Sequence, residues 1–264
     1  MNSLQRYTCK ATLIALCLAF ASGAYAQISS INSAIITPRV WNDYPSATVT
    51  YLNNYASLIT LGESGEYNTG SSGYANRDFW QFSNNGGSSA YVLGAGDTAF
   101  TASFTLNASG ATTVDNEAGW IIPNANGLFP GGDMQFIADP QSGFLGFFGG
   151  PGYWNSGLTY TAGETVTMGM TYFYDTPNSE NALQFWVNAG SGNIYSPVQD
   201  WSGNLAGDNL GAYFQLQGID NSLNGPGTSG QAVFSDISIS VPEPSTLAFL
   251  GLGMVTLLLR RRHI

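Results

Sequence analysis

Apolar and polar residues alternate along many short segments of the chain, a pattern that predicts β-strands with one buried face. The clearest such segment spans residues 165–174, where every second side chain is apolar: Val166, Met168, Met170, Tyr172 and Tyr174. Similar alternation covers residues 47–52, 77–82, 97–106, 182–188, 210–217 and 232–241. Shorter apolar runs at 118–122, 134–138 and 144–148 are bounded by Gly or Pro, which favour turns.

Within residues 182–188 the alternation places Leu183, Phe185 and Val187 on one face, and Gln184 and Trp186 on the other. No segment between the two chain ends shows a sustained helical period. Many short strands with frequent turn signals are typical of a sandwich or barrel. The sequence therefore predicts an all-β fold, an antiparallel β-sandwich.

The first 26 residues have a different pattern. Arg6 and Lys10 precede an apolar stretch at 11–20, and Ala24 and Ala26 form a small-x-small cleavage site. This arrangement predicts a signal peptide, helical in its apolar part, that is removed so that the mature chain begins at Gln27.

The last 24 residues form three successive parts. A rigid Pro242, Glu243, Pro244 spacer precedes an uncharged apolar stretch at 245–259, and three cations close it: Arg260, Arg261 and Arg262. Arginines on one side of an apolar helix orient it with those arginines in the cytoplasm. At ~1.5 Å per residue the stretch is shorter than the ~30 Å hydrocarbon core, so we expect a marginal transmembrane helix.

This tail resembles the PEP-CTERM sorting signal of bacterial surface proteins. The resemblance implies that an exosortase-type membrane enzyme recognises Pro242, Glu243 and Pro244 and removes the segment that follows. It also implies transient anchoring in the inner membrane, followed by placement at the cell surface or in the extracellular (biofilm) matrix. An ordinary membrane anchor is the alternative, but it would not need the Pro-Glu-Pro spacer.

Between the signal peptide and the sorting segment at 241–264 lies a body of residues 27–240, which we expect to form one domain. The only cations of the body are Arg39 and Arg77, against sixteen acids, so its net charge is −14. This charge excludes nucleic acid and anionic membrane surfaces as partners. The body has no Cys, His or Lys, so it has no thiol nucleophile, no base for a serine nucleophile and no zinc site. We therefore expect no catalytic residues and no enzyme.

Residues 97–241 resemble a lectin-like, concanavalin-type jelly roll. The resemblance rests on Phe100 to Phe104, Glu117 to Trp120, Asp133 to Phe136, the 165–174 strand and Val233 to Ile237. It implies a sandwich whose first strands come from residues 27–96. Aromatic residues in such sandwiches stack on sugars, which suggests Trp80, Trp186 and Gln184 as glycan-binding residues. A sandwich core also takes up tryptophan, and for any single tryptophan a core position is favoured.

Two further sites are suggested by carboxylates. Asp115 and Glu117 share one strand face, and a carboxylate pair is what glycoside hydrolysis needs, although the Glu-x-Asp-x-x-Glu arrangement of jelly-roll glucanases is absent. Calcium prefers oxygen ligands in loops, although no EF-hand or repeat pattern is present and solvated loop acids are the favoured interpretation. Its candidate ligands lie at expected strand edges: Asp133, Asp139, Asp175, Asp208 and Asp220. The sequence thus leaves three classes open: a structural or adhesive surface protein, which we favour, an exopolysaccharide-binding module, and a glycan hydrolase.

Overall fold

The computed structural model describes residues 27–67, 73–110, 114–123, 133–149, 152–201, 203–219 and 225–241. Several predictions fall outside these ranges. They concern the signal peptide with Ala24 and Ala26, the apolar stretch at 245–259, Asp220, and the motif residues Pro242, Glu243, Pro244, Arg260, Arg261 and Arg262. No helix in the described part of the chain is long and apolar enough to cross a membrane.

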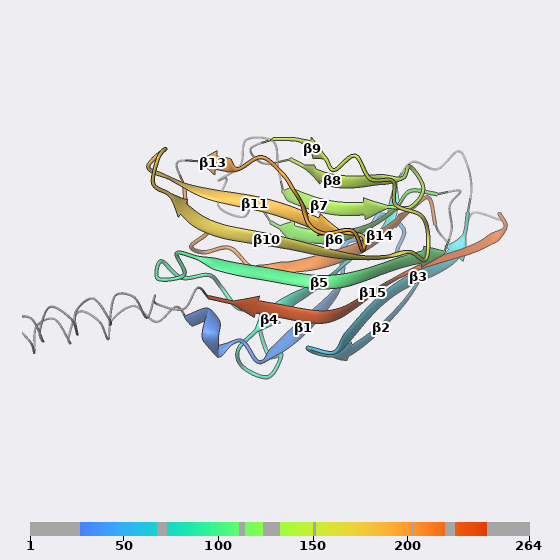
Figure 1. The fold of residues 1–264 in the computed structure, drawn as a ribbon. Coiled ribbons are helices and arrows are strands. Elements are labelled where there is room, and N and C mark those ends of the chain that lie inside the picture. Colours follow the sequence, from blue (N-terminus) through green and yellow to red (C-terminus); the bar gives the residue numbers. More distant parts are fainter. Residues whose placement is uncertain are drawn as a thin grey trace, which may run out of the picture.

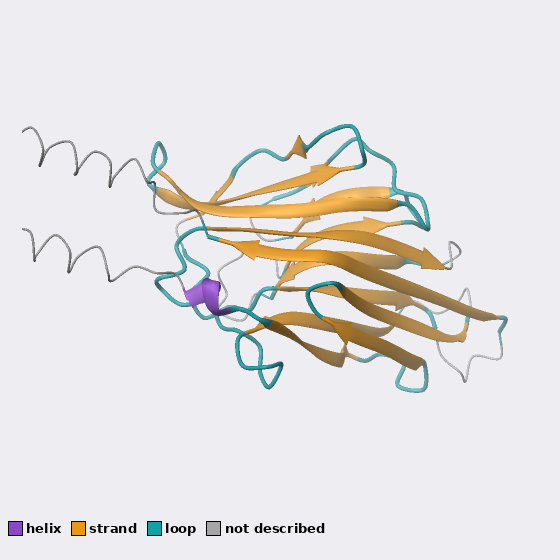
Figure 2. Cartoon of the chain, turned by 60° about the horizontal axis from the view of Figure 1, so that its bottom comes forward, coloured by secondary structure: helices purple, strands orange, loops and turns teal. Residues whose placement is uncertain are grey.

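The described residues form a two-layered antiparallel sandwich, shown in Figures 1 and 2. The seven-stranded sheet has, in order, β1 (Ser33–Trp41), β4 (Tyr74–Ser83), β14 (Gly211–Gln217), β6 (Asn116–Ile122), β7 (Met134–Asp139), β8 (Phe144–Phe148) and β9 (Trp154–Asn155). The eight-stranded sheet has β12 (Ile194–Tyr195), β11 (Glu180–Asn188), β10 (Thr165–Asp175), β5 (Phe100–Gly110), β15 (Gly227–Ser240), β3 (Leu58–Glu66) and β2 (Thr48–Asn54). Its eighth strand, β13 (Gln199–Trp201), pairs with β11.

Strand alternation builds the core between the two sheets. On β5 every second side chain is fully buried, namely Phe100, Ala102, Phe104, Leu106 and Ala108. Burial of these apolar faces is the main stabilising contribution, at about 25 cal/mol for each Å² removed from water. The alternation predicted for β11 is confirmed, because Leu183, Phe185 and Val187 are buried to 1% exposure or less.

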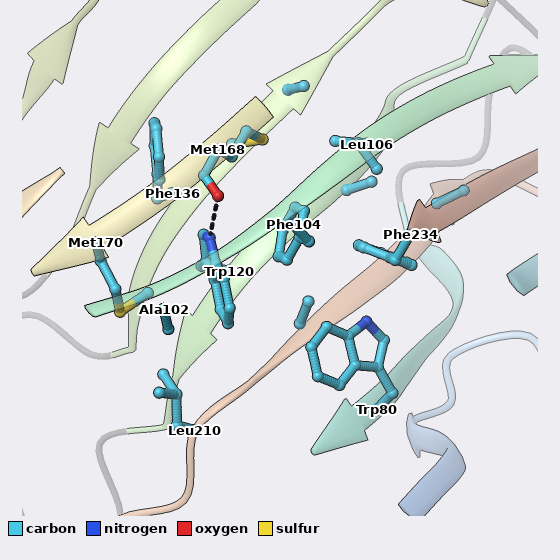
Figure 3. Close-up of a cluster of buried hydrophobic side chains, with 14 of the residues drawn as sticks. Trp80, Ala102, Phe104, Leu106, Trp120, Phe136, Met168, Met170, Leu210 and Phe234 are labelled. Carbon is cyan, nitrogen blue, oxygen red and sulfur yellow. Dashed lines mark hydrogen bonds between the residues drawn. The ribbon is translucent and has the colours of Figure 1, made fainter. Parts of the chain in front are cut away.

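Aromatic rings fill the centre of this core. Trp120 on β6 lies 4.3 Å, centroid to centroid, from Phe104, and its indole nitrogen donates a hydrogen bond to the Met168 carbonyl at 3.1 Å (Figure 3). Trp80 lies 6.0 Å from Trp120 and 5.7 Å from Phe234. The rings come from both sheets, so their contacts hold the two layers together.

Both ends of the described chain lie at one end of the sandwich, which we call the terminal end. β15 finishes at Ser240, opposite Thr101 near the start of β5, and the short 3-10 helix η1 (Gln27–Ser30) contacts β15 (Figure 1). The turn that joins β7 to β8, between Asp139 and Phe144, lies at the other end. It does so because β7 ends beside the start of β6, which is hydrogen-bonded to the far end of β5. We call this the opposite end.

The predicted fold class is confirmed, and residues 27–96 supply the first four strands, as expected. Every alternating segment identified in the sequence contains or overlaps a strand. The sequence did not predict β1 or β3. β1 contains Thr37, Pro38 and Arg39 in succession, and β3 has Glu63 at a core position, so neither strand shows clean alternation.

Candidate functional site

The outer face of the seven-stranded sheet carries a chain of hydrogen-bonded polar side chains. Nε of Arg77 on β4 donates to Gln215 Oε1 at 2.6 Å, and Gln215 Nε2 donates to Glu117 Oε2 at 2.5 Å. The Tyr213 hydroxyl lies 2.6 Å from Gln135 Oε1 and 3.2 Å from Glu117 Oε2. These five residues, the outer-face network, come from four adjacent strands, so the sheet itself fixes their positions.

Arg77 is held firmly within this network. Its guanidinium lies 4.8 Å from the Trp41 ring centroid and 5.2 Å from that of Tyr213, and cation–π attraction favours both contacts. It also forms an ion pair with Asp133 at 3.4 Å. With these partners Arg77 positions neighbouring side chains and is poorly placed to bind an anionic ligand.

Apolar rings adjoin the network on the same face. Phe79, Ile121, Ile137 and Tyr213 form a second small cluster, and the partly buried Phe144 and Phe148 pack against it. The Phe144 ring lies over Gly146, where an added Cβ would come within 2.9 Å of Phe144 Cζ. Tyr153 is 68% exposed, and its ring lies 5.8 Å from that of Phe144 at an interplanar angle of 30°.

Two open cavities meet at Phe144. The first has a volume of about 280 Å³ and is lined by Glu117, Ile137, Asp139, Ser142, Phe144, Phe148 and Tyr153. The second has a volume of about 440 Å³ and is lined by Ser142, Gly143, Phe144, Asn155, Gly157, Leu158 and Thr159. They share Ser142 and Phe144, so we treat them as one surface, the Phe144 groove. It lies around the β7–β8 turn, at the opposite end of the sandwich.

The carboxylates at this groove differ in their surroundings. Asp139 is 4% exposed and accepts hydrogen bonds from the Gln141 backbone at 2.8 Å and from the Ser142 hydroxyl at 2.5 Å. Burial raises the pKa of Asp115, and the charge of Asp139 and a hydrogen bond with it raise that pKa further. Burial also raises the pKa of Glu117, helped by the charge of Asp115 and opposed by the donors Gln215 and Tyr213. The groove therefore contains Asp139, which accepts two hydrogen bonds, and Glu117, whose carboxyl keeps a proton more readily than usual.

The structure places the predicted glycan-binding residues in two different environments, the core and an outer sheet face. Trp80 is 0% exposed in the centre of the core, so the prediction that it stacks on a sugar is wrong. Trp186 and Gln184 are partly exposed on the outer face of the eight-stranded sheet, where Gln184 Nε2 donates to the Ser196 carbonyl at 3.1 Å. These two therefore remain candidates on a surface distinct from the Phe144 groove.

The five calcium candidates do not form one site. Asp133 pairs with Arg77, Asp139 holds the β7–β8 turn, and Asp175 accepts a hydrogen bond from Asn178 at 2.8 Å. Asp208 is 1% exposed in the segment before β14. Within the described ranges, no group of three or more His, Cys, Asp or Glu residues is arranged to hold a metal ion. The structure therefore does not bring the Asp133, Asp139, Asp175 and Asp208 carboxylates together as calcium ligands.

Sequence reasoning found part of the groove. It placed Asp115 and Glu117 on one strand face. In the structure Glu117 lies on β6, and Asp115 is the residue directly before that strand. It did not find Tyr153, Phe144 and Phe148 as surface residues, although the aromatic run at 144–148 was visible. The β7–β8–β9 pairing brings Asp139 and Asn155 to the same surface, and a single sequence contains no signal for that pairing.

Comparison with known proteins identifies the C-terminal segment. Residues 240–262 match the family model of the PEP-CTERM protein-sorting motif, which is the substrate signal for exosortase processing. The motif implies that the chain is exported and held at the membrane for sorting. No curated protein matches the chain.

Solved structures similar to the body include alginate lyases and a lectin. An alginate lyase from Corynebacterium sp. aligns at 11% identity and a TM-score of 0.46, over 80% of this chain and 94% of that one. Basic winged bean lectin with Tn-antigen aligns at 12% identity and 0.39, over 79% and 99%. A variant of alginate lyase A1-II' aligns at 13% identity and 0.43, over 73% and 83%. At these identities the likeness concerns the fold alone. The chain thus has a PEP-CTERM sorting motif, which implies export, and an antiparallel β-sandwich body.

Proposed function

We propose that the body is an adhesive module that binds a neutral extracellular polysaccharide in the Phe144 groove. The observation that supports this most is the composition of the groove, which places partly exposed aromatic rings beside hydroxyl, amide and carboxylate groups. A sugar ring has an apolar face and a rim of hydroxyls, so it needs both kinds of contact. Two cavities side by side suit successive units of a chain.

Charge favours a neutral glycan over an acidic one. The body has sixteen acids and two cations, and both cations are engaged. Arg39 donates to Asn76 Oδ1 at 2.6 Å, and Arg77 is held by Asp133, Gln215 and two rings. An acidic polysaccharide would meet Glu117 and Asp139 in the groove with no free cation to offset the repulsion.

The position of the groove suits adhesion by an anchored protein. β15 ends at Ser240, where the sorting motif begins, and Val241 still packs against the core. Attachment therefore starts at the terminal end, with almost no linker. The groove lies at the opposite end and would point away from the attachment point.

Binding should depend on the exposed aromatic rings. We expect Tyr153→Ala to weaken retention on neutral polysaccharides about tenfold, which corresponds to ~1.4 kcal/mol, through loss of one stacking face. Affinity electrophoresis on galactomannan, mixed-linkage β-glucan and dextran measures the change. Tyr51→Ala is the matched control, since Tyr51 is 58% exposed on β2, outside the groove. Equal effects of both changes, or retention only on alginate, would contradict the proposal.

One observation favours glycan hydrolysis as a second candidate. Glu117 and Asp139 line the same cavity; burial raises the pKa of Glu117, and Asp139 accepts hydrogen bonds from the Gln141 backbone and the Ser142 hydroxyl. A carboxylic acid and a carboxylate on either side of a glycosidic bond are the groups that hydrolysis uses, one to protonate the leaving oxygen and one to activate water.

A single isosteric change separates hydrolysis from binding. Glu117→Gln removes the acidic proton but keeps the side-chain shape, so a hydrolase would keep its glycan affinity and lose reducing-end release by at least about a hundredfold. Glu180→Gln, in the other sheet, is the control with the same change in charge. If the wild-type chain retains a polysaccharide overnight without releasing reducing ends, the protein is a binding module only.

A further inference from the structure

The eight-stranded sheet carries its own aromatic surface. Trp186 on β11 points away from the core, and its indole lies flat over Gly169 on the neighbouring strand β10. A Cβ on Gly169 would lie between 2.1 and 2.7 Å from three indole atoms, Cζ2, Cε2 and Nε1. Glycine is therefore required beneath the ring. One ring face rests on the sheet, which leaves the other turned outward on a partly exposed residue.

A second ring and uncharged polar groups surround Trp186. Tyr195 is directly opposite it in the β11–β12 pair and is 53% exposed, with its hydroxyl accepting from Asn193 Nδ2 at 3.2 Å. We call Trp186, Gly169 and Tyr195 the Trp186 platform. The outward positions of β5 and β10 beside it carry hydroxyls: Thr101, Ser103, Thr105, Thr167 and Thr171. Thr101 and Thr171 are hydrogen-bonded to each other at 3.3 Å, which orders this face.

The chemistry of this face fits a neutral glycan better than other partners. A flat ring with hydroxyl and amide neighbours matches the apolar face and hydroxyl rim of a sugar. The central outward positions named above carry no charge, so nothing there attracts an ionic ligand. Two aromatic side chains also offer less apolar area than a stable protein interface of about 800 Å² per partner requires.

We propose that the Trp186 platform is a second glycan-binding surface and that one body cross-links two polysaccharide chains. The proposal rests on the proposed function of the Phe144 groove. The two surfaces lie on the outer faces of different sheets, which pack about 10 Å apart with their apolar inner faces toward each other. A polysaccharide bound to one surface therefore does not block the other surface. By cross-linking, an anchored adhesin would join polysaccharide chains of the matrix to one another as well as to the cell.

Cross-linking and binding are separable by experiment. The purified chain is mixed with soluble galactomannan, mixed-linkage β-glucan or dextran, and light scattering is followed as the protein-to-glycan ratio increases. A bivalent binder gives a scattering maximum at an intermediate ratio and a fall in excess protein, because each chain is then saturated separately. Trp186→Ala and, as a milder second variant, Tyr195→Ala are each expected to abolish the maximum. Both should keep the affinity of the groove in affinity electrophoresis, and thermal melting confirms that they are folded.

The possible results distinguish the groove, the platform and cross-linking from one another. Tyr153→Ala should also abolish the scattering maximum while leaving weak binding through the platform, and the double variant Tyr153→Ala, Trp186→Ala should bind nothing. Wild-type binding with no maximum at any ratio overturns cross-linking and leaves the groove proposal intact. An unchanged maximum with folded Trp186→Ala and Tyr195→Ala overturns the Trp186 platform as the second binding surface and also leaves the groove proposal intact. Loss of all binding in Trp186→Ala alone shows that the groove is not a site and overturns the proposed function instead.

Discussion

Trp80→Ala is expected to lower the free energy of unfolding by about 3–5 kcal/mol, the range for truncating a buried large ring. Trp80 is 0% exposed, and its ring lies within 6.1 Å, centroid to centroid, of four others: Phe82, Phe104, Trp120 and Phe234. Alanine would leave a cavity between the sheets, where the rigid strands limit collapse. This loss is a large share of the ~5–15 kcal/mol that stabilises a typical domain. Urea denaturation measures it.

Trp80→Phe is the informative control. The Trp80 indole nitrogen is buried and has no hydrogen-bond partner in the described structure, so phenylalanine removes an unpaired donor together with some volume. Trp120→Phe removes a similar volume but also the hydrogen bond to the Met168 carbonyl. We expect the change at residue 120 to cost more, by about 0.5–1.5 kcal/mol. A loss below about 1 kcal/mol for Trp80→Ala would show that the ring is not part of the core.

The Trp80 error shows where sequence patterns fail in this fold. On β4, alternation separates Phe79 from Trp80 and Phe82, but both faces are aromatic, so the pattern cannot say which one is outside. The structure buries both faces, because Phe79 belongs to the second cluster on the outer face of the sheet. On β11 the contrast between Gln184 and its apolar neighbours is clear, and the predicted orientation is correct.

The candidate site was predictable only within single strands. The two-residue spacing of Asp115 and Glu117 shows that they share a face. Asp139 joins them because β6 and β7 pair in antiparallel register, and Tyr153 comes from the segment that precedes β9. Such pairings depend on tertiary packing, which no local pattern encodes. The sorting motif, in contrast, is a contiguous signal, and it was identified from its own residues.

β3 was missed because a carboxylate occupies one of its core positions. Ile59, Leu61 and Glu63 share the inward face, and Glu63 is 3% exposed. It meets Asp78 on β4, which is also buried and accepts a hydrogen bond from the Arg39 backbone at 2.7 Å. Burial, and next the charge of Asp78, raise the pKa of Glu63 well above its ordinary value of 4.5, while a nearby backbone N–H and Arg39 lower it less. Burial also raises the pKa of Asp78.

The pair is best described as one carboxylic acid and one carboxylate that share a proton. Both carboxylate oxygens of Glu63, and Oδ2 of Asp78, are buried with no well-formed hydrogen bond in the described structure. A proton between them provides the missing donor. It also avoids the cost of two buried negative charges, which is larger than one arginine nearby can offset.

Glu63→Gln should therefore stabilise the protein at high pH. The folded pair keeps a proton that the unfolded chain releases above pH 4.5, so its contribution is complete below that pH and is lost as pH rises through the raised pKa. Each unit by which the pKa is raised corresponds to about 1.4 kcal/mol. Glutamine cannot ionise, and its amide donates to Asp78 Oδ2 at every pH. Melting temperatures of wild type and variant should agree near about pH 4 and diverge towards about pH 9, with the variant higher.

Glu66→Gln, at the end of the same strand, changes the net charge equally and should not reproduce this divergence. Asp115 and Glu117 also have raised pKa values and add a loss of stability in the same direction, but both proteins contain them, so their effect cancels in the difference. A variant that is less stable than wild type at the alkaline end would mean that Glu63 is ionised in the fold and held by a cation. The Arg39 guanidinium would then be its partner, and the pair with Asp78 would not share a proton.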